Sequence, residues 1–77
     1  MNFKAIYFNL WSQVWQLHKE FANMKGSDEE WTSLVDKSGE IMKQHENTPQ
    51  AEFVKGLILV VIDEIERCDR AKRKENL

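Results

Sequence analysis

The stretch FKAIYFNLWSQVWQLHKEFANM, residues 3–24, decides the fold that we predict for this chain. Its apolar side chains recur at alternating steps of four and three residues, which is the spacing of a heptad seam along one α-helix. The seam consists of Phe3, Tyr7, Leu10, Val14, Leu17, Phe21 and Met24. We therefore predict a first helix over about residues 3–24, with Asn2 as its N-cap.

The stretch KGSDEEW, residues 25–31, separates this helix from the next one. Gly26 can adopt the left-handed backbone conformation that ends a helix. Ser27 and Glu30 have the S-x-x-E spacing of a capping box, which begins a helix. We predict a second helix over about residues 28–46. Its apolar face is predicted to contain Trp31, Leu34, Val35, Ser38, Ile41, Met42 and His45.

The stretch ENTPQ, residues 46–50, is a second interruption. Thr48 is a suitable N-cap, and Pro49 suits the first position of a helix because its missing N–H would have no partner there. We predict a third helix over about residues 49–72, followed by a frayed basic tail. Its inward side chains are predicted to be Phe53, Val54, Leu57, Ile58, Val61, Ile65 and Cys68.

The run LILVVI, residues 57–62, taken alone also suits a buried strand, because periodicity does not separate the two structures in short runs. The pairs Asp63–Arg67 and Glu66–Arg70 have the i,i+4 spacing that stabilises a helix. No other segment offers a partner strand. The fold class predicted is therefore all-α, an up-down-up three-helix bundle with no strands.

Composition favours one small globular domain over residues 1–77. Apolar residues make up 42% of the chain and charged residues 31%, which is typical of a folded protein. A chain of this length buries a small core and often gains further stability from oligomerisation. Cys68 is the only cysteine, which excludes an internal disulfide. The net charge of −2 gives no general attraction to nucleic acid or to anionic lipid.

The N-terminal residues MNFKAIYFNLW lack the basic region and the small-residue cleavage site of an export signal. The longest apolar run is far shorter than the roughly 18–20 residues that span a bilayer. Together with the single cysteine, these features lead us to expect a cytoplasmic protein with no membrane segment.

The outer two predicted helices carry more apolar surface than one core needs. At 3.6 residues per turn, the apolar arcs of the first and third helices each span roughly 200°, whereas that of the second spans roughly 120°. The surplus side chains are Phe8, Trp11, Trp15, Leu59 and Ile62. One interpretation is that the aromatic rings lie over the crevices of a thin core. The other is that they form an interface with a second copy, with the second helix outside, or with another helical protein.

Few residues suggest chemistry. Glu64 lies within the apolar arc of the third helix, so it is either an acid or base with a raised pKa or a structural hydrogen-bonding group. We expect a Trp indole, His18 or His45 as its donor. The histidines and Cys68 lack the local spacing of metal ligands, and no nucleophile motif is present. We therefore expect no enzyme, no cofactor, no metal and no small-molecule substrate.

A basic cluster near the C-terminus supports an alternative function. Phosphate groups of nucleic acid attract such clusters, although acidic residues are interleaved with this one. The alternative is an accessory nucleic-acid-binding protein that uses Arg67, Arg70, Lys72, Arg73 and Lys74.

The stretches FNLWSQVWQLHKEF and FVKGLILVVIDEIER resemble a loose group of short helical bacterial proteins. The shared features are a W-x-x-x-W-x-x-H-K opening, a middle acidic helix with one Trp, and a closing K-x-L-x-L-x-V-x-D-E-x-E-R helix. The group is similar to cargo of prophages or conjugative elements and has no assigned activity. The resemblance implies a bacterial, cytoplasmic protein and assigns a role to no residue.

Overall fold

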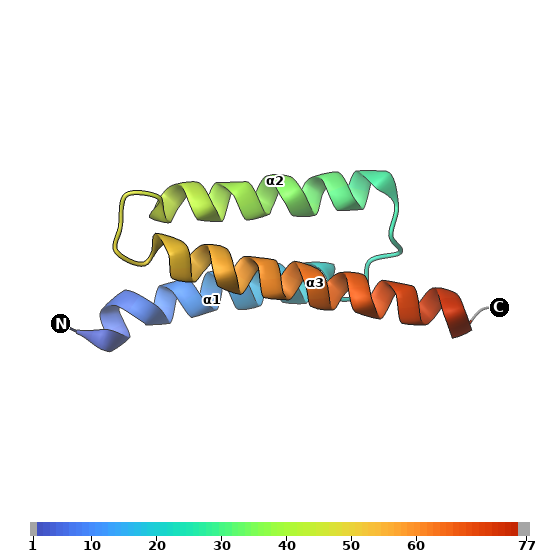
Figure 1. The fold of residues 1–77 in the computed structure, drawn as a ribbon, viewed down its shortest axis with the longest axis horizontal. Coiled ribbons are helices and arrows are strands. Elements are labelled where there is room, and N and C mark those ends of the chain that lie inside the picture. The colour runs from blue at the N-terminus through green and yellow to red at the C-terminus, as the bar shows by residue number, and fades with distance from the viewer. Residues whose placement is uncertain (1, 76–77) are drawn as a thin grey trace.

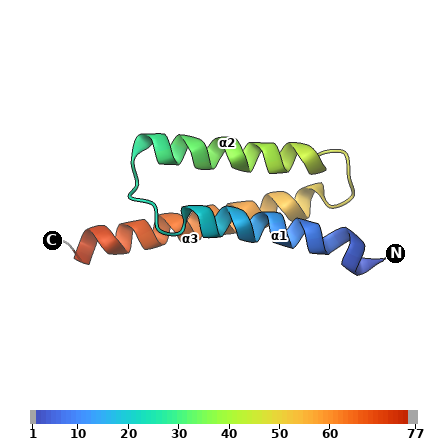
Figure 2. The ribbon, with the colours of Figure 1, turned by 180° about the vertical axis from the view of Figure 1, so that it is seen from behind.

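The computed structural model describes residues 2–75 and the side chains of residues 2–72, and within them it contains three α-helices and no strand. The helices are α1 (Phe3–Phe21), α2 (Asp28–His45) and α3 (Ala51–Glu75). They run up, down and up, so that α1 and α3 point the same way and α2 runs against both (Figures 1 and 2). Each helix contacts the other two. The predicted all-α three-helix bundle is confirmed.

The core lies where the apolar periodicity placed it. Leu34, Val54 and Ile58 are completely buried, and the α1 seam packs against them. The buried apolar side chains are Leu10, Val14, Leu17, Phe21, Met24, Leu34, Val54, Ile58 and Ile65. Ser38 of α2 lies among them with 1% of its surface exposed, and its Oγ has no hydrogen-bond partner.

The first two helices begin as the sequence predicts. The side chain of Asn2 accepts a hydrogen bond from the backbone N–H of Ala5 at 3.1 Å. Ser27 and Glu30 form both bonds of the capping box. The Glu30 carboxylate also accepts the backbone N–H of Lys25 at 3.2 Å. These backbone donors, Ser27 foremost, hold the pKa of Glu30 below its ordinary value.

The end of α1 differs from the prediction. The helix ends at Phe21, three residues earlier than expected, and the Met24 N–H bonds to the Phe21 carbonyl in a turn at 3.2 Å. Gly26 then adopts a positive φ of 86°, inside the connection rather than at the end of the helix. The chain has to leave the helix early because the backbone N–H groups of Lys25 and Ser27 both point to the Glu30 carboxylate.

The start of α3 also differs, because Thr48 is not its N-cap. The Thr48 hydroxyl donates to the carbonyl of His45 at 2.7 Å, so it satisfies a free carbonyl at the end of α2. The first α-helical bond of α3 runs from the Val54 N–H to the Gln50 carbonyl at 2.9 Å, and the helix begins two residues later than predicted. The helix continues to Glu75, where the sequence predicted a frayed tail after residue 72; residues 76–77 of that tail lie outside the described part of the chain.

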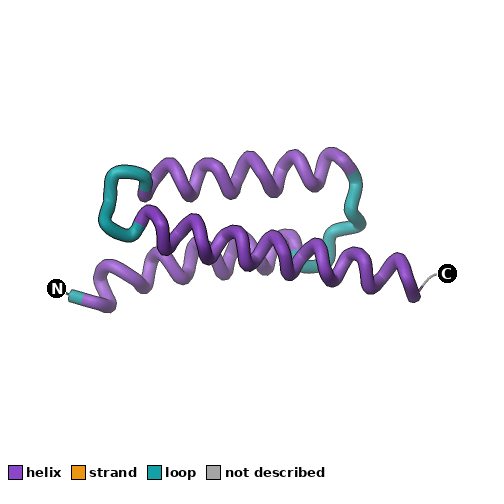
Figure 3. The backbone as a smooth tube through the Cα atoms, in the orientation of Figure 1, coloured by secondary structure: helices purple, strands orange, loops and turns teal. Residues whose placement is uncertain are grey.

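The molecule is elongated, measuring 51 × 20 × 17 Å. The two connections lie at opposite ends, and the first turns of α1 and the last turns of α3 project beyond α2 (Figures 1 and 3). Phe3 therefore lies outside the core that the seam predicted for it; it is 64% exposed and stacks on Tyr7 with ring centroids 4.8 Å apart. Val35, predicted to face inward, is 62% exposed because it lies at the edge of the narrow apolar arc of α2.

Over the described residues, none of the three helices combines the length and the apolar character that a bilayer span requires.

Candidate interaction surface

Besides Phe3 at its first turn, α1 exposes three further aromatic side chains to solvent. Phe8, Trp11 and Trp15 expose 63%, 50% and 58% of their surface. Their spacing of three and four residues places them on one stripe, roughly 120° around α1 from the buried seam. We call these three residues the aromatic ridge.

Contacts with the other helices fix the direction in which the ridge points. The ring of Trp11 meets that of Phe53 in α3 edge to face, with centroids 5.7 Å apart. On the other side of α1, the side-chain amide of Gln13 donates a hydrogen bond to the side-chain oxygen of Gln44 in α2 at 2.6 Å. The ridge therefore borders α3 and points away from α2.

A small cleft of about 130 Å³ lies where the ridge meets α3. The side chains that line it are Trp11, Val14, Trp15, His18 and Val61. Beside it, the Lys19 ammonium lies 5.2 Å from the centre of the Trp15 ring, a cation–π contact. The lining of this cleft is mostly apolar and includes one imidazole, so the cleft suits an apolar side chain of a partner.

Leu59 and Ile62, predicted to share an interface with the ridge, occupy different positions. Leu59 is 49% exposed, whereas Ile62 is half-buried and packs against the core. At 100° per residue, Leu59 lies roughly 120° around α3 from Phe53, but Val60 lies only roughly 20° from it. Val60 is 65% exposed. The exposed apolar side chain of α3 nearest the ridge is therefore Val60.

We define the α1–α3 face as the surface of these two helices that is opposite α2. It contains Phe8, Trp11 and Trp15 of α1, and Phe53, Gly56 and Val60 of α3. Sequence reasoning did not assign Val60 to this surface, because the side of α3 that faces α1 was unknown. The angular distance from Phe53 identifies Val60 once the contact between Trp11 and Phe53 is available.

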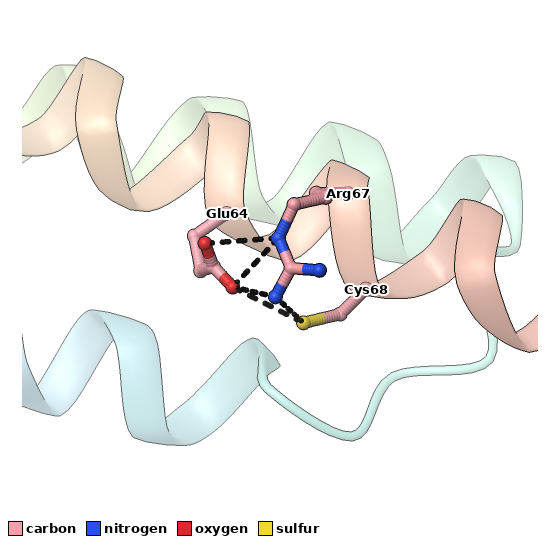
Figure 4. Close-up of polar contacts among 3 residues, drawn as sticks. All are labelled: Glu64, Arg67 and Cys68. Carbon is pink, nitrogen blue, oxygen red and sulfur yellow. Dashed lines mark hydrogen bonds and ion pairs between the residues drawn. The ribbon is translucent and has the colours of Figure 1, made fainter.

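Glu64 is held by its own helix (Figure 4). The Arg67 guanidinium donates to its carboxylate from Nη2 and, at 3.1 Å, from Nε. The Cys68 thiol donates to the same carboxylate at 3.5 Å. Arg67 first, and then Cys68, hold the pKa of Glu64 below its ordinary value. The hypothesis of an acid or base with a raised pKa was wrong, and the group is a structural one.

The basic cluster is partly neutralised by neighbouring carboxylates. Arg67 pairs with Glu64 rather than with Asp63, so the predicted Asp63–Arg67 pair was wrong. The predicted Glu66–Arg70 pair is confirmed at 3.4 Å. Lys72 is exposed, and the side chains of Arg73 and Lys74 lie outside the described residues. Two of the five cations proposed for nucleic-acid binding therefore already have an anionic partner.

A groove of about 500 Å³ lies between α1 and α2; most of the residues that line it have polar or charged ends, and Leu17 and Ile41 contribute apolar surface. Across it the Lys37 ammonium pairs with Glu20. His45 lies 2.8 Å from the Gln13 Oε1, so the imidazole joins these helices. No group of three or more His, Cys, Asp or Glu side chains that could hold a metal ion occurs among the described residues.

Comparison with known proteins found no protein family, no curated protein and no solved structure that matches this chain.

Proposed function

We propose that this protein acts through protein–protein contact, and that its partner at the α1–α3 face is a second copy of itself. The observation that carries the proposal is the exposure of all three rings of the aromatic ridge on one stripe of α1. Isolated exposed apolar residues are ordinary, but a contiguous patch of large aromatic rings marks an interaction site.

The size of the patch supports the proposal. A buried aromatic side chain covers roughly 150–250 Å², so the exposed halves of Phe8, Trp11 and Trp15 amount to roughly 300–400 Å². Val60 enlarges the patch on the α3 side. A standard interface buries about 800 Å² on each partner. The apolar centre of the α1–α3 face is thus about half of such an interface, and a polar rim supplies the rest in typical complexes.

A second copy is the occupant we favour because two-fold homodimers are the commonest oligomers. A chain of 77 residues also gains stability that its small core does not supply. This arrangement leaves α2 on the outside. Tryptophan and tyrosine are the side chains that most often dominate binding energy at interfaces, so the ridge should contain the residues on which association depends.

Sedimentation equilibrium over a range of concentrations tests the proposal. We expect the wild type to exceed its monomer mass of 9.1 kDa at tens of micromolar and to approach twice that mass. Trp15→Asp places a charge in the ridge and should return the protein to the monomer mass. Val35→Asp is the matched control, because Val35 is equally exposed but lies on α2, and this variant should still associate.

Circular dichroism establishes that both variants are folded. A wild type that sediments as a 9.1 kDa monomer at tens of micromolar contradicts the proposal. Equal loss of association in both variants contradicts the assignment of the contact to the α1–α3 face.

A further inference from the structure

The two halves of the α1–α3 face differ in height. On α1, the aromatic ridge projects from the helix, and its three rings expose half or more of their surface. On α3, the outward stripe consists of Gly56, which has no side chain, and Val60; we call these two residues the low row. Phe53 does not add to its height, because its ring is partly buried against α1. The face is therefore a high aromatic row beside a low row.

Two copies can bring these faces together around a two-fold axis in two simple ways, because α1 and α3 are parallel within one copy (Figure 1). If the axis runs along the helices, α1 lies on α3 of the second copy, and these four helices all point the same way. If the axis runs across the helices, α1 lies antiparallel on α1 of the second copy, and α3 lies antiparallel on α3.

Shape favours the axis that runs along the helices. With the axis across the helices, the two ridges meet each other, and the thickness of their rings holds the two low rows apart. With the axis along the helices, each ridge meets the low row of the other copy, so both halves of the face close together. Interfaces between subunits are packed as closely as protein interiors, and only the second arrangement gives such packing over the whole face.

An axis along the helices also fixes which residues meet. The rotation leaves every residue at its own height, so residues that are level within one copy are level between the copies. The ring centroids of Tyr7 and Phe53 are 5.6 Å apart, and Trp15 and Val61 line the same cleft. An α1 residue is therefore level with the α3 residue about 46 positions later. Trp15 then lies over Val60 of the second copy.

Charge leads to the same arrangement. Lys19 borders the ridge, roughly 40° around α1 from Trp15 on the side away from α3. Asp63 borders the low row, roughly 60° around α3 from Val60 on the side away from α1. It is exposed, and no ion pair involves it among the described side chains. With the axis along the helices, Lys19 and Asp63 of the second copy lie on the same edge at heights that differ by about 3 Å.

The axis across the helices gives an unfavourable charge pattern. A rotation about the middle of the ridge brings Lys4 of one copy level with Lys19 of the other, and the symmetry repeats this pair. Like charges placed together at an interface oppose association, whereas the pairs of Lys19 with Asp63 favour it. Arg67 and Glu64, which also lie on α3, neutralise each other.

We propose that the two-fold axis of the dimer runs parallel to its helices, so that α1 of each copy packs on α3 of the other, with Trp15 over Val60 and Lys19 beside Asp63. This inference rests on the proposed function and names the surface of the second copy that the ridge contacts. The α1 and α3 helices of both copies form the centre of the dimer, and the two α2 helices lie outside.

Charge reversal at Lys19 separates the two arrangements, because they predict effects of opposite sign. In sedimentation equilibrium at low salt, we expect Lys19→Glu to raise the dimer dissociation constant about tenfold, since it places two carboxylates together at each of two symmetric sites. With the axis across the helices, the same change would face Lys4 and lower that constant. Lys43→Glu is the matched control, because Lys43 is also a lysine in the last turn of its helix but lies on α2; it should leave the constant unchanged.

The reciprocal change tests the pairing itself. Asp63→Lys alone should also raise the dissociation constant. Combined with Lys19→Glu in one chain, it should return the constant to about the wild-type value, because the pair is restored with its charges exchanged. This rescue shows that neither single change acts through loss of the fold, and circular dichroism of each variant verifies this.

Cross-linking tests the contact in the wild-type protein. A carbodiimide joins an amine directly to a carboxylate that it contacts. We expect a covalent dimer on a denaturing gel, and we expect its digest to contain a peptide that links Lys19 to Asp63. Within one copy these two residues lie on opposite edges of the α1–α3 face, so this link joins separate copies.

The outcomes separate this inference from the proposed function. If Trp15→Asp dissociates the dimer but Lys19→Glu strengthens it, or has no more effect than Lys43→Glu, the α1–α3 face is the contact and the parallel arrangement is wrong. A charge exchange that does not restore association, or a covalent dimer without the link from Lys19 to Asp63, also overturns the arrangement. A monomeric wild type overturns both proposals.

Discussion

Ser38→Ala should stabilise this protein. The Ser38 hydroxyl is buried in the core and has no hydrogen-bond partner, so folding removes it from water without compensation. Such an unsatisfied group costs about 1–3 kcal/mol. Alanine also has a higher helix propensity than serine, by about 0.5 kcal/mol. Against these gains stands the loss of the packing contacts of one oxygen atom, which is small. We expect the free energy of unfolding to rise by about 1.5–3 kcal/mol.

Thermal unfolding followed by circular dichroism measures the effect. For a domain of this size, 1 kcal/mol shifts the midpoint by about 4–8 °C. All samples are compared at one protein concentration, because association itself raises the midpoint. Ser33→Ala is the control: this serine is also in α2 but only partly buried, so the change should give the helix-propensity gain alone. A Ser38→Ala protein no more stable than Ser33→Ala would refute the reasoning, since the hydroxyl must then have a partner such as a buried water.

Four further changes test other parts of the fold. Leu34→Ala should lower the free energy of unfolding by about 2–5 kcal/mol in urea titrations, because Leu34 is completely buried and the change leaves a cavity. Gly39→Ala should raise the thermal midpoint by an amount equivalent to about 0.5–1 kcal/mol, because its Cβ enters open space. Ser27→Ala should cost about 1 kcal/mol in the same assay by removing the capping box of α2. The Glu64 carboxylate has a lowered pKa in the folded protein, so it stabilises the fold above its ordinary pKa of 4.5. This stabilisation is lost as the pH falls through the lower pKa of the folded state. Glu64→Gln should therefore show a smaller drop in thermal midpoint between about pH 6 and pH 3 than the wild type.

The apolar spacing predicted which side chains form the core, because helical periodicity depends only on local geometry. Leu10, Val14 and Leu17 are buried as the seam in residues 3–24 indicates. The capping box of Ser27 and Glu30 was also predictable, since its partners are three residues apart. Both bonds of a capping box join residues three apart, so the local sequence is enough to predict them.

Tertiary structure decided the features that depend on a choice between partners. Thr48 was free to cap α3 or to bond the carbonyl at the end of α2, and the path of the connection selected the second. Phe3 belongs to the core seam by spacing, but no helix extends far enough to cover it.

The residues that make up the α1–α3 face likewise could not be predicted from the sequence alone. Periodicity identified Phe8, Trp11 and Trp15 as surplus to one core, and all three are exposed. It could not tell that Val60, rather than Leu59, lies on the same side of α3 as Phe53. An apolar arc of roughly 200° does not show by itself which part of it faces a neighbouring helix. The sequence by itself thus determined the helices and their buried sides. The packing of α3 against α1 determined which of the remaining apolar side chains share one face, because only a contact such as Trp11 with Phe53 fixes the rotation of one helix relative to another.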